Sequence, residues 1–382
     1  MPQPSSSPAA ATPGSAIRVM VVDDSVFVRG IIARWLSDDP AFELVGTYSN
    51  GKAALGDLER VQPDVVILDL EMPEMDGLTA LPLILKQRRN TTVIVASALS
   101  RRGAEISLKA LTLGAADYLP KPDATKGTFA TDDFKRELME KVRSLGLKVL
   151  RQAGRAPALP PPSVQPQAAA AAASPPRGPI RLRPYSASDV SLIAVGSSTG
   201  GPQALTRLFA VLGPYLERIP VVITQHMPAT FTALLAEHVS RAAGRQAAEG
   251  QEGEVLAAGR IYIAPGGKHM LLERDGPRTL IRLSDGPAVN FCKPAVDPMF
   301  DTVAQIYRRN ALALVLTGMG SDGARGAGLI ADAGGSVIVQ DEETSVVWGM
   351  PGATAHAGNA SEVLPLQAIG PKVIAMLARR RG

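Results

Sequence analysis

The sequence of 382 residues is 46% hydrophobic and 4% aromatic, and its formal net charge at pH 7 is +4. This length suffices for two ordinary domains with aliphatic cores, and the small, scattered positive charge does not predict nucleic acid as a partner. The single cysteine, Cys292, excludes an internal disulfide and a zinc site made of cysteines, which fits a cytoplasmic protein.

The N-terminal segment shows no sign of a targeting or membrane-spanning sequence. Residues 1–15 are rich in proline and serine and lack both a charged start and an apolar stretch. A run of about 18 apolar residues, the length needed to cross a bilayer, is not found in the chain. We therefore expect residues 1–15 to form a disordered tail and the protein not to insert into a membrane.

Between residues 16 and 148, short apolar strands alternate with helix-period segments, which predicts one α/β domain. Such alternation is typical of a parallel sheet with helices on both faces, here of five strands in the flavodoxin-like order. Sites in these folds lie at the carboxyl ends of the strands. The expected strands are 17–22, 44–47, 65–70, 93–97 and 118–119, and the clearest helical segments are 28–36 and 105–113.

Three carboxylates follow two of these strands. Asp23 and Asp24 end the first strand and Asp69 ends the third, which the flavodoxin-like order places side by side. Crowded carboxylates repel one another unless a cation neutralises them, and Mg²⁺ favours such oxygen ligands. A helix N-cap at Asp23–Ser25 is the alternative, and it is disfavoured because Asp69 is followed by further acidic and turn residues at 71–77.

A phosphoryl group on Asp69 would lie between the metal, the amine of Lys121 and the hydroxyl of Ser97, because both residues end strands at the same edge. With these residues at these positions, residues 17–145 resemble a two-component response-regulator receiver domain. The resemblance implies that Asp69 accepts phosphate from a sensor histidine kinase, that Asp23 and Asp24 are Mg²⁺ ligands, and that Ser97, Lys121 and the aromatic Tyr118 form the switch.

A linker is expected at residues 149–188. This stretch is rich in proline, contains the alanine run Ala168–Ala173, and has no acidic residue between Arg151 and Ser188. Such a composition cannot bury a core and predicts a semi-extended tether. A second domain is therefore expected at residues 189–382.

The second domain repeats the alternation, which predicts another doubly wound α/β fold. Its expected strands are 191–195, 221–224, 260–263, 312–316 and 336–340. Residues 196–200 match G-x-S-x-G between a strand and an amphipathic segment, so Ser198 is a candidate nucleophile. The alternative is a phosphate-binding turn, but the dinucleotide pattern requires glycine at position 198, and no Gly-Lys-Ser/Thr follows.

A serine nucleophile needs a base and an orienting acid, and the chain has four histidines. His226 ends a strand at the same edge as Ser198, whereas His269, the alternative base, is expected in a turn. Asp322, in the glycine-rich loop 316–323 after another strand, is the candidate acid, with a turn-stabilising aspartate as the alternative. The backbone amides of Met319 and Thr199 are candidate oxyanion donors.

The order Ser, His, Asp differs from the α/β-hydrolase order. Instead, the second domain resembles the catalytic domain of the bacterial chemotaxis protein-glutamate methylesterases, CheB. The resemblance implies that Ser198, His226 and Asp322 form a triad that needs no cofactor, and that the enzyme demethylates glutamate methyl esters and deamidates certain glutamines on chemoreceptors. It also implies that phosphorylation activates the enzyme. The motifs that carry the resemblance are 196–201, 225–228, 264–270, 293–297 and 318–323.

Two small departures from the family pattern are Ser197, where alanine is usual, and Asn290–Cys292, where a more basic stretch is common. They leave the preferred receptor open. Two other functions are weighed against this one. A DNA-binding output domain is disfavoured by the strands throughout the second half and by its lack of a basic recognition helix, whereas a receptor-docking scaffold without catalysis stays open.

Overall fold

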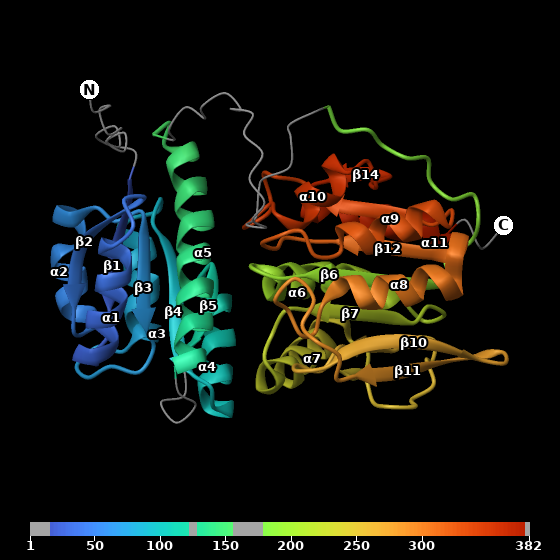
Figure 1. The fold of residues 1–382 in the computed structure, drawn as a ribbon, viewed down its shortest axis with the longest axis horizontal. Coiled ribbons are helices and arrows are strands. Elements are labelled where there is room, and N and C mark those ends of the chain that lie inside the picture. The colour runs from blue at the N-terminus through green and yellow to red at the C-terminus, as the bar shows by residue number, and fades with distance from the viewer. Residues whose placement is uncertain (1–15, 122–127, 156–178, 379–382) are drawn as a thin grey trace, which may run out of the picture. The chain divides into compact units, whose positions relative to one another are not determined.

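The computed structural model describes residues 16–121, 128–155 and 179–378, which form two compact units, each around its own sheet (Figure 1). The tail expected at residues 1–15 and the middle of the expected linker lie outside the described residues.

The first unit contains a five-stranded parallel sheet in the order β2-β1-β3-β4-β5, so the flavodoxin-like prediction is confirmed. The order makes β1 and β3 neighbours and thereby brings the residues at their carboxyl ends together. β3 is buried along its whole length, as expected for a central strand covered on both faces. The strands are β1 (Ile17–Val22), β2 (Phe42–Tyr48), β3 (Val65–Asp69), β4 (Thr92–Ala98) and β5 (Asp117–Lys121).

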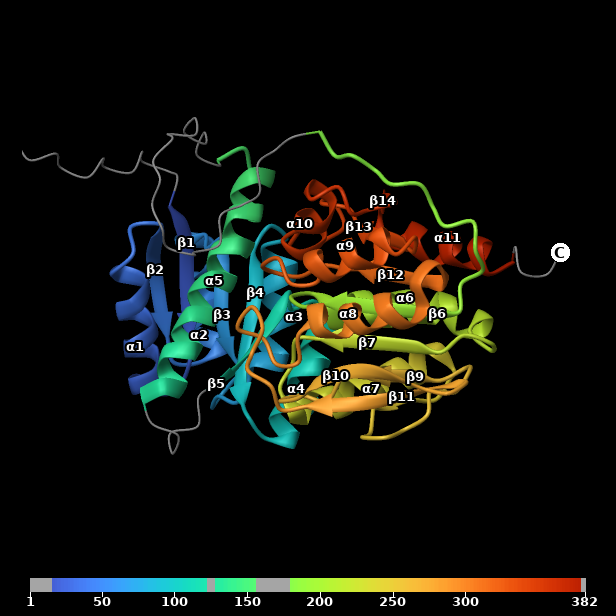
Figure 2. The ribbon, with the colours of Figure 1, turned by 45° about the vertical axis from the view of Figure 1, so that its right-hand side comes forward.

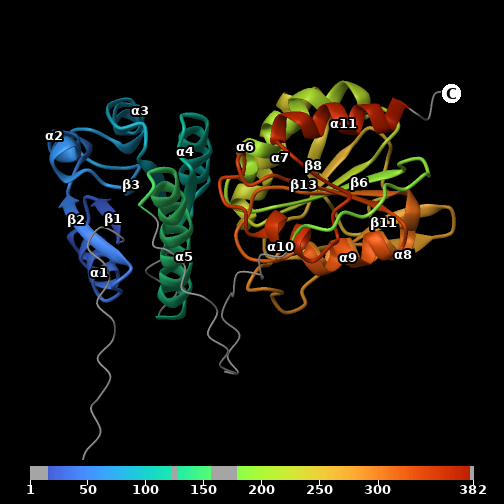
Figure 3. The ribbon, with the colours of Figure 1, turned by 90° about the horizontal axis from the view of Figure 1, so that it is seen from above.

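Two layers of helices cover this sheet, with α1 and α5 on one face and α2, α3 and α4 on the other (Figure 3). Side-chain caps start four of them: Ser25, Asn50, Asp76 and Ser100 each accept a hydrogen bond from an amide three residues later. The helices are α1 (Val26–Ser37), α2 (Gly51–Val61), α3 (Gly77–Gln87), α4 (Arg101–Thr112) and α5 (Thr128–Gln152).

The second unit contains a seven-stranded sheet in the order β14-β13-β12-β6-β7-β9-β8, and every paired strand is parallel. The chain moves outward in one direction from β6 and in the other from β12, so the topological switch point lies between them. β12, β6 and β7 lie side by side (Figure 2). The strands are β6 (Leu192–Ser197), β7 (Val221–Gln225), β8 (Ala247–Glu249), β9 (Ile261–Ile263), β12 (Ala311–Val315), β13 (Ser336–Gln340) and β14 (Glu362–Leu364).

Helices cover both faces of this sheet too, with α6, α7 and α11 on one side and α8, α9 and α10 on the other (Figure 3). An antiparallel hairpin, β10 (His269–Asp275) and β11 (Arg278–Ser284), packs against α8 and was not predicted. The helices are α6 (Gly201–Leu212), α7 (Ala229–Ala243), α8 (Val296–Tyr307), α9 (Ala324–Asp332), α10 (Met350–His356) and α11 (Leu366–Ala378), with short 3₁₀ turns at Gly213–Tyr215 and Arg308–Asn310.

Both described ends of the expected linker are structured. α5 continues to Gln152, past the expected domain boundary at residue 148. At the other end, the amide of Arg183 donates to the carbonyl of Ala360 at 2.8 Å, and the amide of Ser186 donates to Ser336 Oγ at 3.0 Å. Backbone hydrogen bonds thus make residues 183–188 part of the second unit, although their composition suggested a tether.

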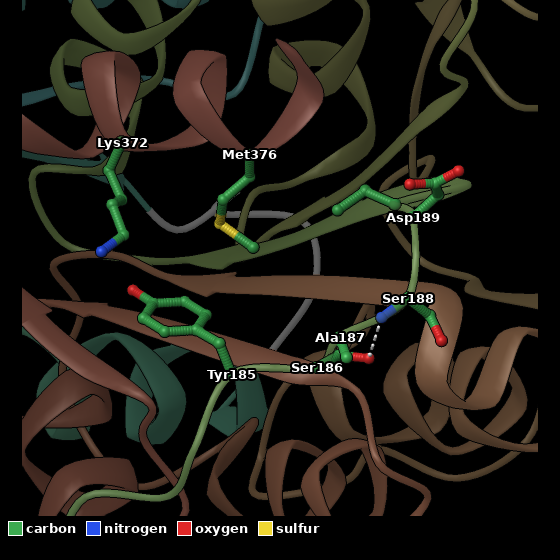
Figure 4. A pocket seen from close by; sticks show the side chains of 8 residues that line it. Tyr185, Ser186, Ala187, Ser188, Asp189, Lys372 and Met376 are labelled. Carbon is green, nitrogen blue, oxygen red and sulfur yellow. Dashed lines mark hydrogen bonds between the residues drawn. The ribbon is translucent and has the colours of Figure 1, made fainter. Parts of the chain in front are cut away.

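Residues 185–188 also line a small pocket, in which the Tyr185 side chain points toward Lys372 of α11 (Figure 4). Met376 of α11 lines the same pocket. Tyr185 donates to Glu362, and Lys372 Nζ lies 2.6 Å from the same carboxylate. The pocket lies near the start of β13, at the amino ends of the strands. It is therefore at the edge of the sheet opposite to the predicted triad.

Candidate functional site

The three predicted triad residues follow three adjacent strands of the second sheet. Ser198 comes directly after β6 and His226 directly after β7, while Asp322 lies in the loop that follows β12. The sheet order places His226 beside the Ser198 turn, where its amide donates to the Ser197 carbonyl at 3.1 Å, and it brings Asp322 from 96 positions away into contact with His226.

The turn around Ser198 depends on glycine. Gly200 has φ of 75°, and a Cβ on Gly201 would lie 1.9 Å from Gln225 Oε1. The carbonyl of Ser198 accepts hydrogen bonds from the Gly201 amide at 2.7 Å and from Gln225 Nε2 at 2.9 Å. These contacts fix the backbone of Ser198 while its side chain stays only half-buried, as a nucleophile requires.

The neighbouring hydroxyl of Ser197 is not available in the same way. It is fully buried and donates to Gln225 Oε1 at 2.7 Å. Ser197, the departure noted in the sequence, therefore supports the turn instead of competing with Ser198.

His226 and Asp322 are in direct contact, with Nε2 of the imidazole 2.7 Å from a carboxylate oxygen. An ionised carboxylate can only accept, so Nε2 carries the proton. Asp322 also accepts hydrogen bonds from the amides of Val296 at 2.6 Å, Asp297 at 3.1 Å and Gly323 at 3.0 Å. Burial would raise the pKa of Asp322, but the hydrogen bond and charge of His226, together with these amides, lower it.

The other nitrogen of His226, Nδ1, lies 3.3 Å from Sγ of Cys292. Burial would lower the pKa of His226, but the electrostatic contact with Cys292 and the hydrogen bond with Asp322 raise it to about 10. Asn290 Nδ2 donates to Asp322 at 3.1 Å. Sequence reasoning gave neither Asn290 nor Cys292 a role, and the only signal was that this stretch departs from the family pattern.

His269, the alternative base, occupies a structural position. It is the first residue of β10 and is 3% exposed, so its expected location in a turn was wrong. Its Nε2 lies 3.0 Å from the carbonyl of Pro287, and its Nδ1 accepts from the amide of Ala295 at 3.1 Å. Backbone groups thus occupy both nitrogens, which leaves His226 as the better base.

The predicted oxyanion donors flank Ser198. A Cβ on Gly318 would lie 2.9 Å from Ser198 Cβ, so the loop that carries Met319 packs directly against the serine. No described residue accepts a hydrogen bond from the backbone amide of Thr199 or of Met319. Both amides therefore remain candidates for a developing negative charge.

In the first unit, the structure brings the predicted carboxylates together. Oxygen atoms of Asp23, Asp24 and Asp69 lie within 4.8 Å of one another. Lys121 Nζ lies 2.7 Å from Asp23 and 2.8 Å from Asp69. Burial raises the pKa of Asp69 against the opposing charge of Lys121, whose own pKa is raised because the two carboxylates outweigh its burial. A set of oxygen ligands with excess negative charge fits Mg²⁺.

The other two predicted switch residues besides Lys121 lie on neighbouring strands, Ser97 near the carboxyl end of β4 and Tyr118 near the start of β5. Ser97 on β4 is 2% exposed and Tyr118 on β5 is 4% exposed. Burial raises the pKa of the Tyr118 hydroxyl. Lys141 Nζ lies 5.1 Å from the centre of the tyrosine ring and donates to the Tyr118 carbonyl at 2.6 Å. Their roles as a switch stay predictions.

None of the helices in the described parts of the chain is long and apolar enough to cross a membrane.

Comparison with known proteins gives two domain matches. Residues 193–373 match the CheB methylesterase family, and residues 19–128 match the response regulator receiver domain. A protein-glutamate methylesterase/protein-glutamine glutaminase of Nitrobacter hamburgensis is 52% identical over 374 residues, which is 97% of each chain. A protein with the same activities in its name, of a group 2 operon in Rhodopseudomonas palustris, is 52% identical over 96% of this chain and 95% of its own.

Among solved structures, the CheB methylesterase catalytic domain of Thermotoga maritima is 38% identical, with a TM-score of 0.48. The match covers 50% of this chain and 100% of that domain.

Proposed function

The chain belongs to the CheB family of chemotaxis methylesterases, and from this premise we propose that Ser198, His226 and Asp322 are its catalytic triad. The protein is a protein-glutamate methylesterase and protein-glutamine glutaminase that carries a receiver domain. The observation that best supports the triad is the 2.7 Å contact between His226 and Asp322 beside the strand end that presents Ser198.

The chemistry is acyl transfer. The hydroxyl oxygen of Ser198 attacks the ester carbonyl carbon while His226 Nδ1 takes its proton, because Nε2 is already bound to Asp322. The proton then passes to the leaving oxygen, the bond from carbon to oxygen breaks, and methanol departs. Water attacks the acyl-enzyme by the same route and releases free glutamate and Ser198. With a glutamine substrate the leaving group is ammonia.

Negative charge on the carbonyl oxygen needs donors during both steps. The amides of Thr199 and Met319 are the proposed pair, since both are next to Ser198 and have no acceptor among the described residues. Fixed backbone donors of this kind contribute about 3 kcal/mol or more to transition-state stabilisation.

The proposed substrates are methylated glutamates and certain glutamines on the cytoplasmic helices of chemoreceptors, so the enzyme would act in the cytoplasm. Each conversion adds one negative charge to a receptor helix. Like charges at neighbouring helical positions repel, so the conversion can change helix packing and hence signalling output.

The receiver would be phosphorylated on Asp69 by a sensor histidine kinase. An oxygen of Asp69 attacks the phosphorus of the kinase's phosphohistidine, and the bond from phosphorus to nitrogen breaks. Asp23, Asp24 and Asp69 would hold Mg²⁺, which would offset the charge of the incoming phosphoryl group. Lys121 would contact the phosphate, and Ser97 and Tyr118 would rearrange around it.

We propose that this rearrangement raises esterase activity by relieving an inhibitory contact between the receiver and the catalytic unit. A contact between domains is typically modest, so a phosphate-driven shift of a few kcal/mol, or about a hundredfold in population, is sufficient. A catalytically silent receptor-binding scaffold is the competing hypothesis.

The experiment that tests the proposed triad measures methanol release from methylated receptor. Ser198→Ala is expected to lower the rate by about 10⁴-fold or more, because the nucleophile is lost. Ser197→Ala is the matched control: its hydroxyl is buried against Gln225, and we expect turnover within about threefold of wild type. If Ser198→Ala kept a few per cent of wild-type turnover, Ser198 would not be the nucleophile.

A further inference from the structure

A tight turn at residues 289–292 brings two side chains onto the proposed triad. Val289 and Cys292 exchange two backbone hydrogen bonds, at 3.1 and 2.9 Å, which leaves Asn290 and Phe291 as the two central residues. Both have positive φ, 51° and 62°. Asparagine tolerates this conformation, but a phenylalanine there is strained. Such strain persists where the surroundings fix it, and this turn is fixed by contacts with Asp322 and His226.

The turn leaves His226 with both nitrogens occupied. Nε2 is bound to Asp322, and that carboxylate also accepts hydrogen bonds from three amides and from Asn290 Nδ2. Asp322 therefore cannot turn away from the imidazole. The proton of Ser198 has to go to Nδ1, which Sγ of Cys292 contacts at 3.3 Å.

We propose that Cys292 is a positioning residue that acts through His226, because its sulfur contacts Nδ1 and competes with Ser198 for that nitrogen in the resting enzyme. The inference rests on the proposed triad. Cys292 is half-buried, so its sulfur is close to the reacting groups without being sealed from solvent.

The charges around His226 support this role. Asp322 and Cys292 contact the ring directly. Behind Asp322 lies the buried carboxylate of Asp297, whose charge Arg325 partly offsets, with Nε 3.6 Å from a carboxylate oxygen. Of the groups that face the ring, the thiol is thus the one that can be removed without disturbing the buried carboxylates.

The first test is the pH dependence of kcat/KM for methanol release by wild type, Cys292→Ser and Cys292→Ala. Both variants remove the sulfur, and the serine keeps a hydrogen-bonding group. We expect the rising limb to move to lower pH by about one unit or more in both, because the sulfur contact that raises the pKa of His226 has been lost. A structural role would instead scale the rate equally at every pH. A rising limb at the wild-type position in both variants would overturn the proposal.

The second test uses the fact that the chain has one cysteine, so iodoacetamide reports on Cys292 alone. The thiolate is the reactive form: sulfur bonds to carbon and iodide leaves. We expect slower alkylation at neutral pH in His226→Gln than in wild type, since the imidazole nitrogen that contacts the sulfur and can take its proton is gone. Equal alkylation rates would contradict the pairing.

Ser198→Ala in the same methanol assay separates this inference from the triad itself. An inactive Ser198→Ala together with an unmoved limb in the Cys292 variants would overturn only the role of Cys292. If Ser198→Ala were active and Cys292→Ser inactive, sulfur would be the nucleophile, and both proposals would fall.

Discussion

In the receiver unit two carboxylates of a cluster of three share one cation, whereas in the catalytic unit one carboxylate is surrounded by donors. Lys121 contacts Asp23 and Asp69, and the exposed Asp24 completes a group with excess negative charge. Asp322 is buried and accepts four hydrogen bonds besides that of His226. Both centres lie at the carboxyl ends of central parallel strands. The fold therefore determines where each site lies. Excess negative charge leaves the receiver site ready to bind a ligand, whereas the hydrogen-bond donors around Asp322 hold the catalytic site in one arrangement beforehand.

Removing the charge of Asp322 should disrupt the proposed catalytic triad most directly. The substitution Asp322→Asn keeps the shape of the side chain but replaces the carboxylate by an amide, which has an NH₂ group facing the surrounding hydrogen-bond donors. The neutral amide also no longer stabilises the imidazolium of His226. We expect kcat for methanol release to fall by about 10⁴-fold, with the thermal unfolding midpoint measured as the control. A fall of less than tenfold with a native-like midpoint would mean that Asp322 only stabilises the turn.

The pH dependence of methanol release also tests the catalytic unit. His226 must be neutral to act as a base, and its pKa is raised to about 10, so activity should increase as pH rises through the neutral range. Below the pKa we expect about a tenfold gain per pH unit, or roughly a thousandfold between pH 6 and 9. The measurement is kcat/KM in buffers of constant ionic strength, and a flat profile would argue against His226 as the base.

The substitution Lys121→Ala removes the cation of the receiver site. The carboxylates of Asp23 and Asp69 then lose the positive charge that they share, and the phosphoryl group loses its contact with Lys121. We expect the activation by a small phosphodonor, about a hundredfold or less, to vanish while basal methanol release stays at the wild-type level. Full activation in this variant would remove Lys121 from the switch.

Much of this comparison could be predicted from the sequence, because the residues involved directly follow apolar strands. Asp23, Asp69, Ser198 and His226 all obey this rule. Two other residues of the site do not: Asn290, which donates to Asp322, and Cys292, which contacts His226, come from a turn beyond the β10–β11 hairpin. The mixed polar and apolar residues of that hairpin gave no clear strand signal. Their position depends on tertiary packing against α8, which local periodicity cannot encode.

The smallest expected effect comes from removing one donor of the preorganised centre. Asn290→Ala deletes one of the four hydrogen bonds to Asp322 and leaves the three amides in place. We expect about a tenfold decrease in kcat, in line with one hydrogen bond to a charged group, and little change in KM. A decrease comparable to that of Asp322→Asn would show that the carboxylate is not held as redundantly as its contacts suggest.

The central claim, that a charge-responsive receiver controls a preorganised esterase, is tested most directly by methanol release from methylated receptor with and without a small phosphodonor and Mg²⁺. Three proteins are compared: full-length enzyme, its Asp69→Asn variant, and a truncated form starting near Pro179, which keeps the hydrogen bonds that residues 183–188 make within the second unit. The account predicts stimulation of the full-length enzyme only, a low unresponsive rate for Asp69→Asn, and a high unresponsive rate for the truncated form. Equal rates in all three proteins under both conditions would contradict it and would leave the receiver as a targeting module.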